Sequence, residues 1–309
     1  MTEHVPVLFD KTLELLNIKP DGIYIDATIG RGGHAEGILE KLQEGEGKLI
    51  GIDKDYEAIK YCRSFFTTER LKLYHDSYIN IPEILARENI KAVSGILFDL
   101  GVSSPQLDNA ERGFSYNQDA YLDMRMNKNQ ALTAAEIINN FSQEKLENII
   151  QKYGEENWAA RIAEFIVDRR KKEKITTTSQ LVELIKNAIP AAARRKGGHP
   201  ARRTFQALRI ATNNELNELE MIMDSLPDLL SSEGRVCVLS FHSLEDRIVK
   251  HKFKEFAREC DCPPDFPICR CDKEKQFRIL TKGPIEADAD EKQKNPRSRS
   301  AKLRAAERI

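Results

Sequence analysis

The first hundred residues alternate short apolar runs of strand length with stretches whose apolar residues recur at helical spacing. The strand-like runs are GIYID (22–26), KLIGID (48–53), LKLYH (71–75) and VSGILFDL (93–100). Such alternation is typical of parallel strands joined by helices that cover both faces of one sheet. The sequence therefore predicts an α/β fold with a mostly parallel sheet.

The strand signal disappears from about Leu132 to Leu230, where apolar residues repeat only at helical spacing. It returns at RVCVLSF (235–241), which is followed by a predicted helix from about Ser243 and a further candidate strand, QFRILT (276–281). A helical block of this length is too long to be one crossover connection. We therefore expect one α/β domain that is interrupted by an all-helical insertion.

The expected bounds are 1–115 and 216–309 for the α/β domain and 116–215 for the insertion.

Over the whole chain there are 48 basic and 49 acidic residues, and this balance argues against a protein that binds nucleic acid through bulk positive charge. The charge is unevenly placed, however, because residues 1–150 carry 16 basic and 24 acidic residues and the remainder carries 32 and 25. This asymmetry is one cue for a nucleic-acid or anionic-surface partner, and an uneven distribution of solvated charges is the commoner alternative.

No apolar stretch approaches the ~18 residues that a membrane-spanning helix needs. The N-terminal residues MTEHVPVLFDK also lack the basic and then apolar layout of a signal peptide. We therefore expect a cytoplasmic protein without a membrane partner.

A glycine-rich turn follows the first predicted strand in YIDATIGRGGHAEGIL (24–39). Glycines let a backbone turn sharply and approach a ligand, and the next helix begins with free amide groups. Asp53 ends the second strand, where a carboxylate can accept both ribose hydroxyls of a nucleoside. The two features predict a nucleoside-cofactor site. Because Gly30, Gly32 and Ala35 also satisfy the dinucleotide pattern G-x-G-x-x-G/A, a nicotinamide-dependent dehydrogenase remains an alternative.

The third and fourth predicted strands each end beside polar candidates for this site. Tyr78 can lie against an adenine ring, with an ordinary packed tyrosine as the alternative. Asp99 opens a long polar loop that should lie over the cofactor, because ligands of open α/β sheets bind outside the carboxyl ends of the strands. A capping role in a turn is the alternative for Asp99.

His242 lies just past the strand RVCVLSF, on the same expected side of the sheet. We weigh a substrate-contacting or loop-ordering role for it against that of a structural histidine. Ser243 and Asp246 resemble a capping box at the start of the next helix.

The cysteines fall into two groups. Cys62 and Cys237 lie singly in apolar surroundings and are predicted to be buried, reduced thiols. The other four form a C-x-C-x6-C-x-C motif that consists of Cys260, Cys262, Cys269 and Cys271. Four thiolates can hold a structural zinc ion, but zinc ligand pairs usually have the spacing C-x2-4-C, and the intervening prolines can equally form a rigid loop. We leave zinc open and assign no metal to the active site.

Several long motifs resemble the bacterial ribosomal RNA small subunit methyltransferase H family. The resemblance runs from about His4 to Arg308, through GIYIDATIGRGGH, GILFDLGVSSPQLDNAERGFSY, LDMRM, YGEE, TFQALRI, LSFHSLEDRIVK and NPRSRSAKLRAAER. It implies a class I, Rossmann-like methyltransferase sheet and S-adenosylmethionine as cofactor. It also implies formation of N4-methylcytidine in the decoding (P-site) region of 16S rRNA. The cofactor contacts that it implies are Gly32, Gly33, His34, Asp53, Tyr78, Asp99 and Gln106.

The chemistry of such a transfer can be reasoned independently. A sulfonium methyl group is already activated, so the enzyme must mainly align the nucleophile and exclude water. The exocyclic N4 of cytosine is a poor nucleophile, and acceptors for its hydrogens would direct its lone pair and stabilise the charge that develops there. We expect Asp99 and the adjoining DLGVSSP backbone to supply such acceptors, and His242 is a second candidate catalytic residue.

Two basic runs are candidate phosphate contacts, and the helical insertion is the candidate RNA-recognition domain. The RNA-binding candidates are Arg194, Arg195, Lys196, Arg202, Arg203, Arg209, Arg297 and Arg299, and NPRSRSAKLRAAER also holds Lys302 and Arg304. The expected partner is 16S rRNA within the 30S subunit, and a homo-oligomer remains open. A non-catalytic RNA-binding or assembly factor with the same fold is the main alternative to an enzyme.

Overall fold

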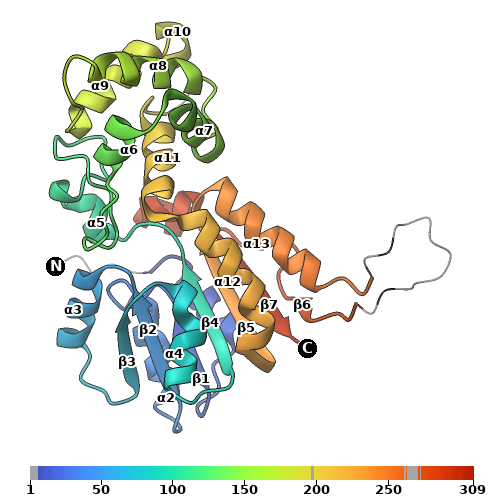
Figure 1. The fold of residues 1–309 in the computed structure, drawn as a ribbon. Helices are drawn as coiled ribbons and strands as arrows, with labels where there is room; N and C mark the ends of the chain where they lie inside the picture. Colours follow the sequence, from blue (N-terminus) through green and yellow to red (C-terminus); the bar gives the residue numbers. More distant parts are fainter. Residues whose placement is uncertain (1–5, 196–197, 261, 263–270, 272) are drawn as a thin grey trace. The chain divides into compact units, whose positions relative to one another are not determined.

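A computed structural model describes residues 6–195, 198–260, 262, 271 and 273–309 (Figure 1). The chain forms two compact units, one of residues up to Gly101 together with Asn217–Ile309, and the other of Val102–Leu216. The helical unit thus begins earlier than the expected residue 116. The reason is packing, because Phe114 is buried in the apolar core of this unit.

The first unit is built on a sheet in which the described strands have the order β3-β2-β1-β4-β5-β7-β6. The strands are β1 (Ile23–Asp26), β2 (Lys48–Asp53), β3 (Leu71–His75), β4 (Val93–Asp99), β5 (Leu230–Ser240), β6 (Phe277–Ile279) and β7 (Lys302–Arg308). Strands β1 to β5 pair in parallel, and β7 pairs antiparallel with both β5 and β6. The expected α/β fold with a mostly parallel sheet is confirmed.

Helices cover both faces of this sheet. Successive side chains of each buried strand point to opposite faces, so both faces carry apolar side chains that must be covered. In β4, Ile96 and Phe98 join one apolar cluster and Leu97 joins the other. The first cluster includes residues of α4, α12 and α13, and the second includes residues of α1, α2 and α3. The helices of this unit are α1 (Phe9–Leu16), α2 (Gly33–Leu42), α3 (Tyr56–Phe65), α4 (Ile81–Arg87), α12 (Glu215–Leu229), α13 (Ser243–Phe256) and α14 (Ala289–Lys294).

Strand β7 was not among the expected elements, because its sequence KLRAAER was interpreted only as a basic run. Leu303, Ala305 and Ala306 are buried in the sheet. Two basic residues of β7 form ion pairs within the unit: Arg304 lies 2.6 Å and Lys302 3.5 Å from the carboxylate of Asp246. Both cations are thus engaged within the first unit, and a phosphate contact by Lys302 or Arg304 stays a prediction.

The second unit is mainly helical, as the spacing of apolar residues predicts. Its helices are α5 (Ser104–Asp108), α6 (Ala134–Asn140), α7 (Gln143–Gly154), α8 (Ala159–Arg170), α9 (Thr178–Ala188), α10 (Ala191–Arg194) and α11 (Arg202–Asn213). Helices α6, α7, α8, α9 and α11 contribute buried side chains to one apolar core, among them Ile162 and Leu208. Across the described part of both units, no helix is long and apolar enough to cross a membrane.

Candidate functional site

Three aspartates lie where parallel strands of the first unit end. Asp26 closes β1, Asp53 closes β2 and Asp99 closes β4. The chain passes from β1 to β2 on one side and later reaches β4 on the other side of β1, so the strand order reverses between β1 and β4. Open α/β sheets bind their ligands at such a switch point, outside the carboxyl ends of the strands.

The turn after β1 has a backbone that favours glycine. Gly30 has φ of +52° and Gly32 has φ of +79°, both in the left-handed region. A Cβ atom on Gly32 would lie 2.4 Å from Cε2 of Phe66, so a side chain there would displace the ring. Because Gly32 is also the N-cap of α2, the turn leads directly into a helix N-terminus without a capping side chain. Such a turn lets a ligand approach the backbone closely.

Asp53 is held in place by two backbone amides. The Gly30 amide donates to its Oδ2 atom at 2.8 Å and the Asp55 amide donates to its Oδ1 atom at 2.8 Å. Each carboxylate oxygen has a second lone pair, so both can still accept from neighbouring ribose hydroxyls. Burial raises the pKa of Asp53 to about 6, against the lowering effect of these two hydrogen bonds.

Asp99 lies beside His34 at the reversal of strand order. Its backbone amide donates to Oγ1 of Thr28 at 2.7 Å, and its Oδ2 atom lies 3.6 Å from Nδ1 of His34. His34 is buried, and its Nε2 atom lies 3.2 Å from the Val7 carbonyl oxygen. The Oδ1 atom of Asp99 is buried and has no hydrogen-bond partner among the described residues. Burial, together with the Glu245 carboxylate, raises the pKa of Asp99 to about 7.

Asp26 completes a group of carboxylates whose proton affinities depend on one another. It is buried, and burial raises its pKa to about 8, with further raising by the charges of Asp99 and Asp53. Its Oδ1 atom accepts from the Thr28 amide at 3.2 Å. Concentrated negative charge that is incompletely solvated would be stabilised by a cationic ligand, which would lower all three pKa values. In the sequence, Asp26 is recognisable only as the end of a predicted strand.

Tyr78 is packed in the core of the first unit, and a contact of its ring with adenine stays a prediction. Its ring makes an edge contact with Phe98 at 5.6 Å between centroids. The Lys54 ammonium lies 5.7 Å from the Tyr78 ring and 2.5 Å from a carboxylate oxygen of Glu218. Glu218 also accepts from the Ser77 hydroxyl at 2.6 Å. These contacts connect the ends of β2 and β3 to α12, and no local sequence pattern predicts them.

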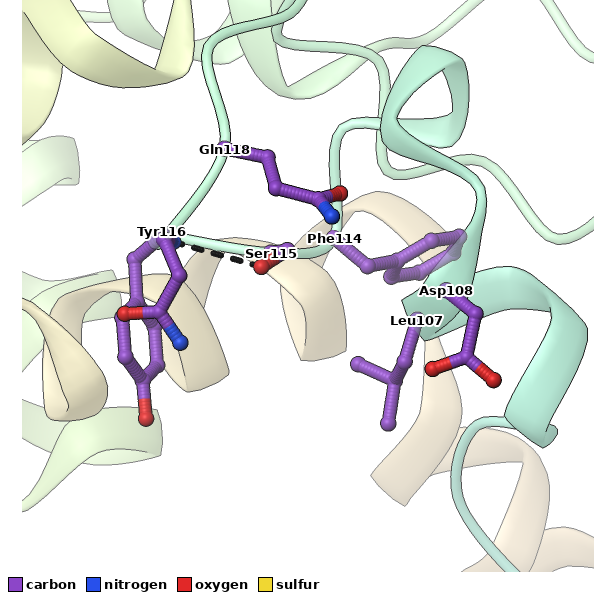
Figure 2. A pocket seen from close by; sticks show the side chains of 7 residues that line it. Leu107, Asp108, Phe114, Ser115, Tyr116 and Gln118 are labelled. Carbon is purple, nitrogen blue, oxygen red and sulfur yellow. Dashed lines mark hydrogen bonds between the residues drawn. The ribbon is translucent and has the colours of Figure 1, made fainter.

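Gln106 and the rest of the long polar loop belong to the second unit. Gln106 is buried, and its Oε1 atom accepts from the Ser103 amide at 2.9 Å, which completes a capping box on α5. Nearby, the residues around Leu107 and Tyr116 line a pocket of about 450 Å³ (Figure 2). The Tyr116 ring stacks on His199 at 4.5 Å between centroids. A cofactor contact by Gln106 stays a prediction.

The family of the chain follows from comparison with known proteins. A family model described as the MraW methylase family matches residues 1–309. The chain belongs to this family. Curated relatives carry the name "Ribosomal RNA small subunit methyltransferase H". The one from Halothermothrix orenii is 57% identical, covering 100% of this chain and 99% of the relative. Those from Clostridium botulinum (strain 657) and Caldicellulosiruptor saccharolyticus are 51% and 50% identical, over at least 99% of each chain.

Membership confirms the expected family and an S-adenosylmethionine-dependent methyltransferase. It also overturns the dehydrogenase alternative, which depended on the glycine pattern alone. The residues present fit this cofactor, because Asp53 offers acceptors for a ribose diol and the three carboxylates suit a sulfonium cation. When bound, the cofactor supplies a methyl group that is already activated for transfer.

His242 is the N-cap residue that precedes α13 in this MraW-family chain, which corrects the expected capping box. The N-cap is His242 and not Ser243, and the acidic partner is Glu245 and not Asp246. The Glu245 amide donates to Nδ1 of His242 at 3.4 Å, while Oε2 of Glu245 accepts from the His242 amide at 3.2 Å. Asp246 is instead held by Arg304. A structural role for His242 is therefore visible, and a contact with substrate stays a prediction.

The candidate RNA-binding cations differ in their surroundings. Arg194, Arg195, Arg202 and Arg203 are exposed in the second unit, and Arg299 is exposed and Arg297 half-buried in the first. Arg209 is different, because Glu215 accepts from its Nε and Nη2 atoms at 2.9 and 2.8 Å. This internal ion pair removes Arg209 from the set that we carry forward. Lys196 lies outside the described residues.

Proposed function

We propose that this MraW-family methyltransferase acts on 16S rRNA and methylates the exocyclic N4 of a cytidine in the decoding (P-site) region. The curated relatives are named as methyltransferases of the ribosomal RNA small subunit, which supports this substrate. The proposed substrate is this RNA within the 30S subunit. The observation that supports methylation of a cytosine amino group is the buried Oδ1 atom of Asp99, an acceptor without a partner in the described part of the chain.

The proposed chemistry depends on how an amino nitrogen attacks a sulfonium carbon. The N4 lone pair of cytosine is delocalised into the ring, so the nitrogen must become pyramidal before it can attack. Asp99 would accept a hydrogen bond from one N4 hydrogen, direct the lone pair toward the methyl group and stabilise the positive charge that develops. The methylated nitrogen is acidic and loses its proton readily, so the step needs no strong base.

The proposed cofactor contacts are Gly32, Gly33, His34, Asp53, Tyr78, Asp99 and Gln106. Asp53 would accept from the ribose hydroxyls, and the glycine turn would let the cofactor approach the backbone. Support for a role of Asp53 comes from its two backbone hydrogen bonds, which fix its carboxylate at the edge of the sheet.

The deciding experiment is transfer of radiolabelled methyl groups from S-adenosylmethionine to unmethylated 30S subunits, with naked 16S rRNA in parallel. We expect incorporation into the subunit, and digestion to nucleosides should yield N4-methylcytidine. Incorporation into another nucleoside would contradict the proposed base chemistry. No incorporation into either substrate, with intact binding of RNA, would instead favour the non-catalytic factor.

The helical unit is proposed to recognise RNA through the exposed arginines near α11. The double variant Arg202→Glu/Arg203→Glu should weaken binding to 30S subunits more than about 10-fold. It should also reduce the slope of log Kd against log salt by about 2, because each phosphate contact contributes about one unit of slope. Binding assays over a series of salt concentrations measure both quantities.

The matched control is Lys172→Glu/Lys174→Glu, which makes the same change in charge at exposed residues of the same unit. It should leave the affinity within about threefold, because screening weakens the effect of distant charges. Equal losses in the two double variants would contradict a local contact.

A further inference from the structure

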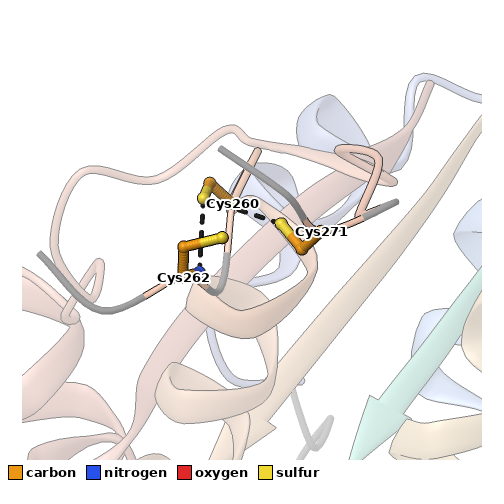
Figure 3. Close-up of side chains that lie close together, drawn as sticks. All are labelled: Cys260, Cys262 and Cys271. Carbon is orange, nitrogen blue, oxygen red and sulfur yellow. Dashed lines mark hydrogen bonds between the residues drawn. The ribbon is translucent and has the colours of Figure 1, made fainter. Parts of the chain in front are cut away.

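Three thiols gather in the segment between α13 and β6. Cys260 follows the end of α13, Cys271 precedes β6, and the sulfur atoms of Cys260, Cys262 and Cys271 all lie within 4.8 Å of one another (Figure 3). The Cys271 thiol lies 3.6 Å from the Cys260 sulfur, and the Cys262 amide donates to the same sulfur at 3.3 Å. Residues distant in the segment are thus brought together at one point.

The spacing of the Cys260 and Cys271 sulfur atoms matches a metal site better than a disulfide. A tetrahedral zinc ion with bonds of about 2.3 Å to sulfur separates its thiolates by about 3.8 Å. A disulfide bond would need a separation of about 2.05 Å. The 3.6 Å between Cys260 and Cys271 lies close to the first value. The amide that points to the Cys260 sulfur also resembles the hydrogen bonds that orient metal-bound thiolates.

The surroundings of these thiols differ from those of the other described cysteines. Cys62 and Cys237 are fully buried, and burial raises the pKa of both thiols, so they behave as inert core residues. Cys260 is exposed, and Cys262 and Cys271 are half-buried. Cysteines are usually buried, so a cluster of three at the surface points to a function.

We propose that Cys260, Cys262 and Cys271 bind one zinc ion that fastens the ends of this segment together. Each thiol releases its proton to solvent as its sulfur bonds to the metal, so binding strengthens as pH rises. The Gln276 amide donates to the Phe256 carbonyl at 2.9 Å at the base of the same segment, so the metal would extend an existing closure. Cys269 lies outside the described residues, and the proposal uses only the other three thiols.

The test measures the metal content of full-length protein that is purified without a histidine tag or chelator. We expect about one zinc per chain. Cys260→Ser, Cys262→Ser and Cys271→Ser should each lose most of it, while Cys62→Ala and Cys237→Ala, which remove a thiol outside the cluster, should retain it. Replacement of zinc by cobalt should produce thiolate-to-metal charge-transfer absorption, and the three serine variants should lose that signal.

Two results would overturn the proposal. One is a wild-type protein that carries no zinc and does not take up added zinc in competition with a chromophoric chelator. The other is a disulfide between Cys260 and Cys271, which differential alkylation and mass spectrometry of the native protein would detect. Because these measurements do not involve methyl transfer, they are independent of the proposed function.

Discussion

Asp99→Ala should lower kcat for methyl transfer by about 100- to 1000-fold, the loss expected when a preorganised group that stabilises developing charge is removed. The residue sits at the end of β4, and its Oδ1 atom is buried without a partner in the described part of the chain. Its removal takes away the acceptor that would direct the N4 lone pair. Turnover should be measured at saturating S-adenosylmethionine with 30S subunits, beside the Kd for S-adenosylhomocysteine.

The comparison of kcat with Kd separates two roles for this carboxylate. If Asp99 acts on the nucleophile, kcat falls while the Kd for S-adenosylhomocysteine changes less than about 10-fold. The reason is that Kd reports the stability of the bound complex, whereas kcat reports the barrier from that complex to the transition state. Near-wild-type turnover at saturating cofactor would contradict the proposal. A large rise in Kd with normal kcat would assign Asp99 to cofactor binding alone.

The pH profile gives a second measurement on the same residue. Burial and the Glu245 carboxylate raise the pKa of Asp99 to about 7, so the group is protonated below that pH and accepts hydrogen bonds poorly. The value of kcat/KM for S-adenosylmethionine, which reports the pKa of the cofactor-free enzyme, should therefore rise as pH increases through about 7 and then level off. Asp99→Asn keeps an acceptor oxygen but cannot ionise, so its lower rate should lack this step.

Much of the fold could be predicted because its signals are local. Each parallel strand is a short apolar run, and each is followed by a helix with its own periodicity, so alternation alone indicates the sheet. The candidate cofactor site could be predicted for the same reason, since the glycine turn and Asp53 adjoin strand ends. Strand β7 was missed because its buried positions, such as Leu303 and Ala305, alternate with basic residues whose ion-pair partners lie far away in sequence.

The contacts within the site could not be predicted, because they join residues that are distant in the chain. The pairing of Lys54 with Glu218 and the approach of His34 to Asp99 depend on how α12 and α2 lie against the sheet. The cap of α13 shows a different limit. Serine is the common N-cap residue, so the pattern favoured Ser243, but His242 takes this position because Glu245 contacts its backbone amide and its ring.

Asp53→Ala should raise the Kd for S-adenosylhomocysteine at least about 100-fold, because it removes two hydrogen bonds to a charged acceptor, and even about 1.5 kcal/mol for each gives about 3 kcal/mol. Isothermal titration calorimetry measures the effect directly. Asp55→Ala is the matched control, since Asp55 lies two residues away and its carboxylate accepts from the Glu57 amide as the N-cap of α3. It should cost about 1 kcal/mol of stability and leave Kd nearly unchanged.

Stability of the cofactor-free protein should respond to the Asp53 substitution in a pH-dependent way. Burial raises the pKa of Asp53 to about 6 from an ordinary value of 3.8, so the folded state holds a proton that the unfolded state releases. The stability that this group contributes is present below about pH 4 and is lost as pH rises to about 6. Asp53→Ala lacks this titration. Its free energy of unfolding relative to wild type should therefore increase over the same interval, which denaturation at a series of pH values measures.

The Kd measurement decides the role of Asp53 in binding. An unchanged Kd in Asp53→Ala, or an equal rise in Asp55→Ala, would show that Asp53 does not hold the ribose.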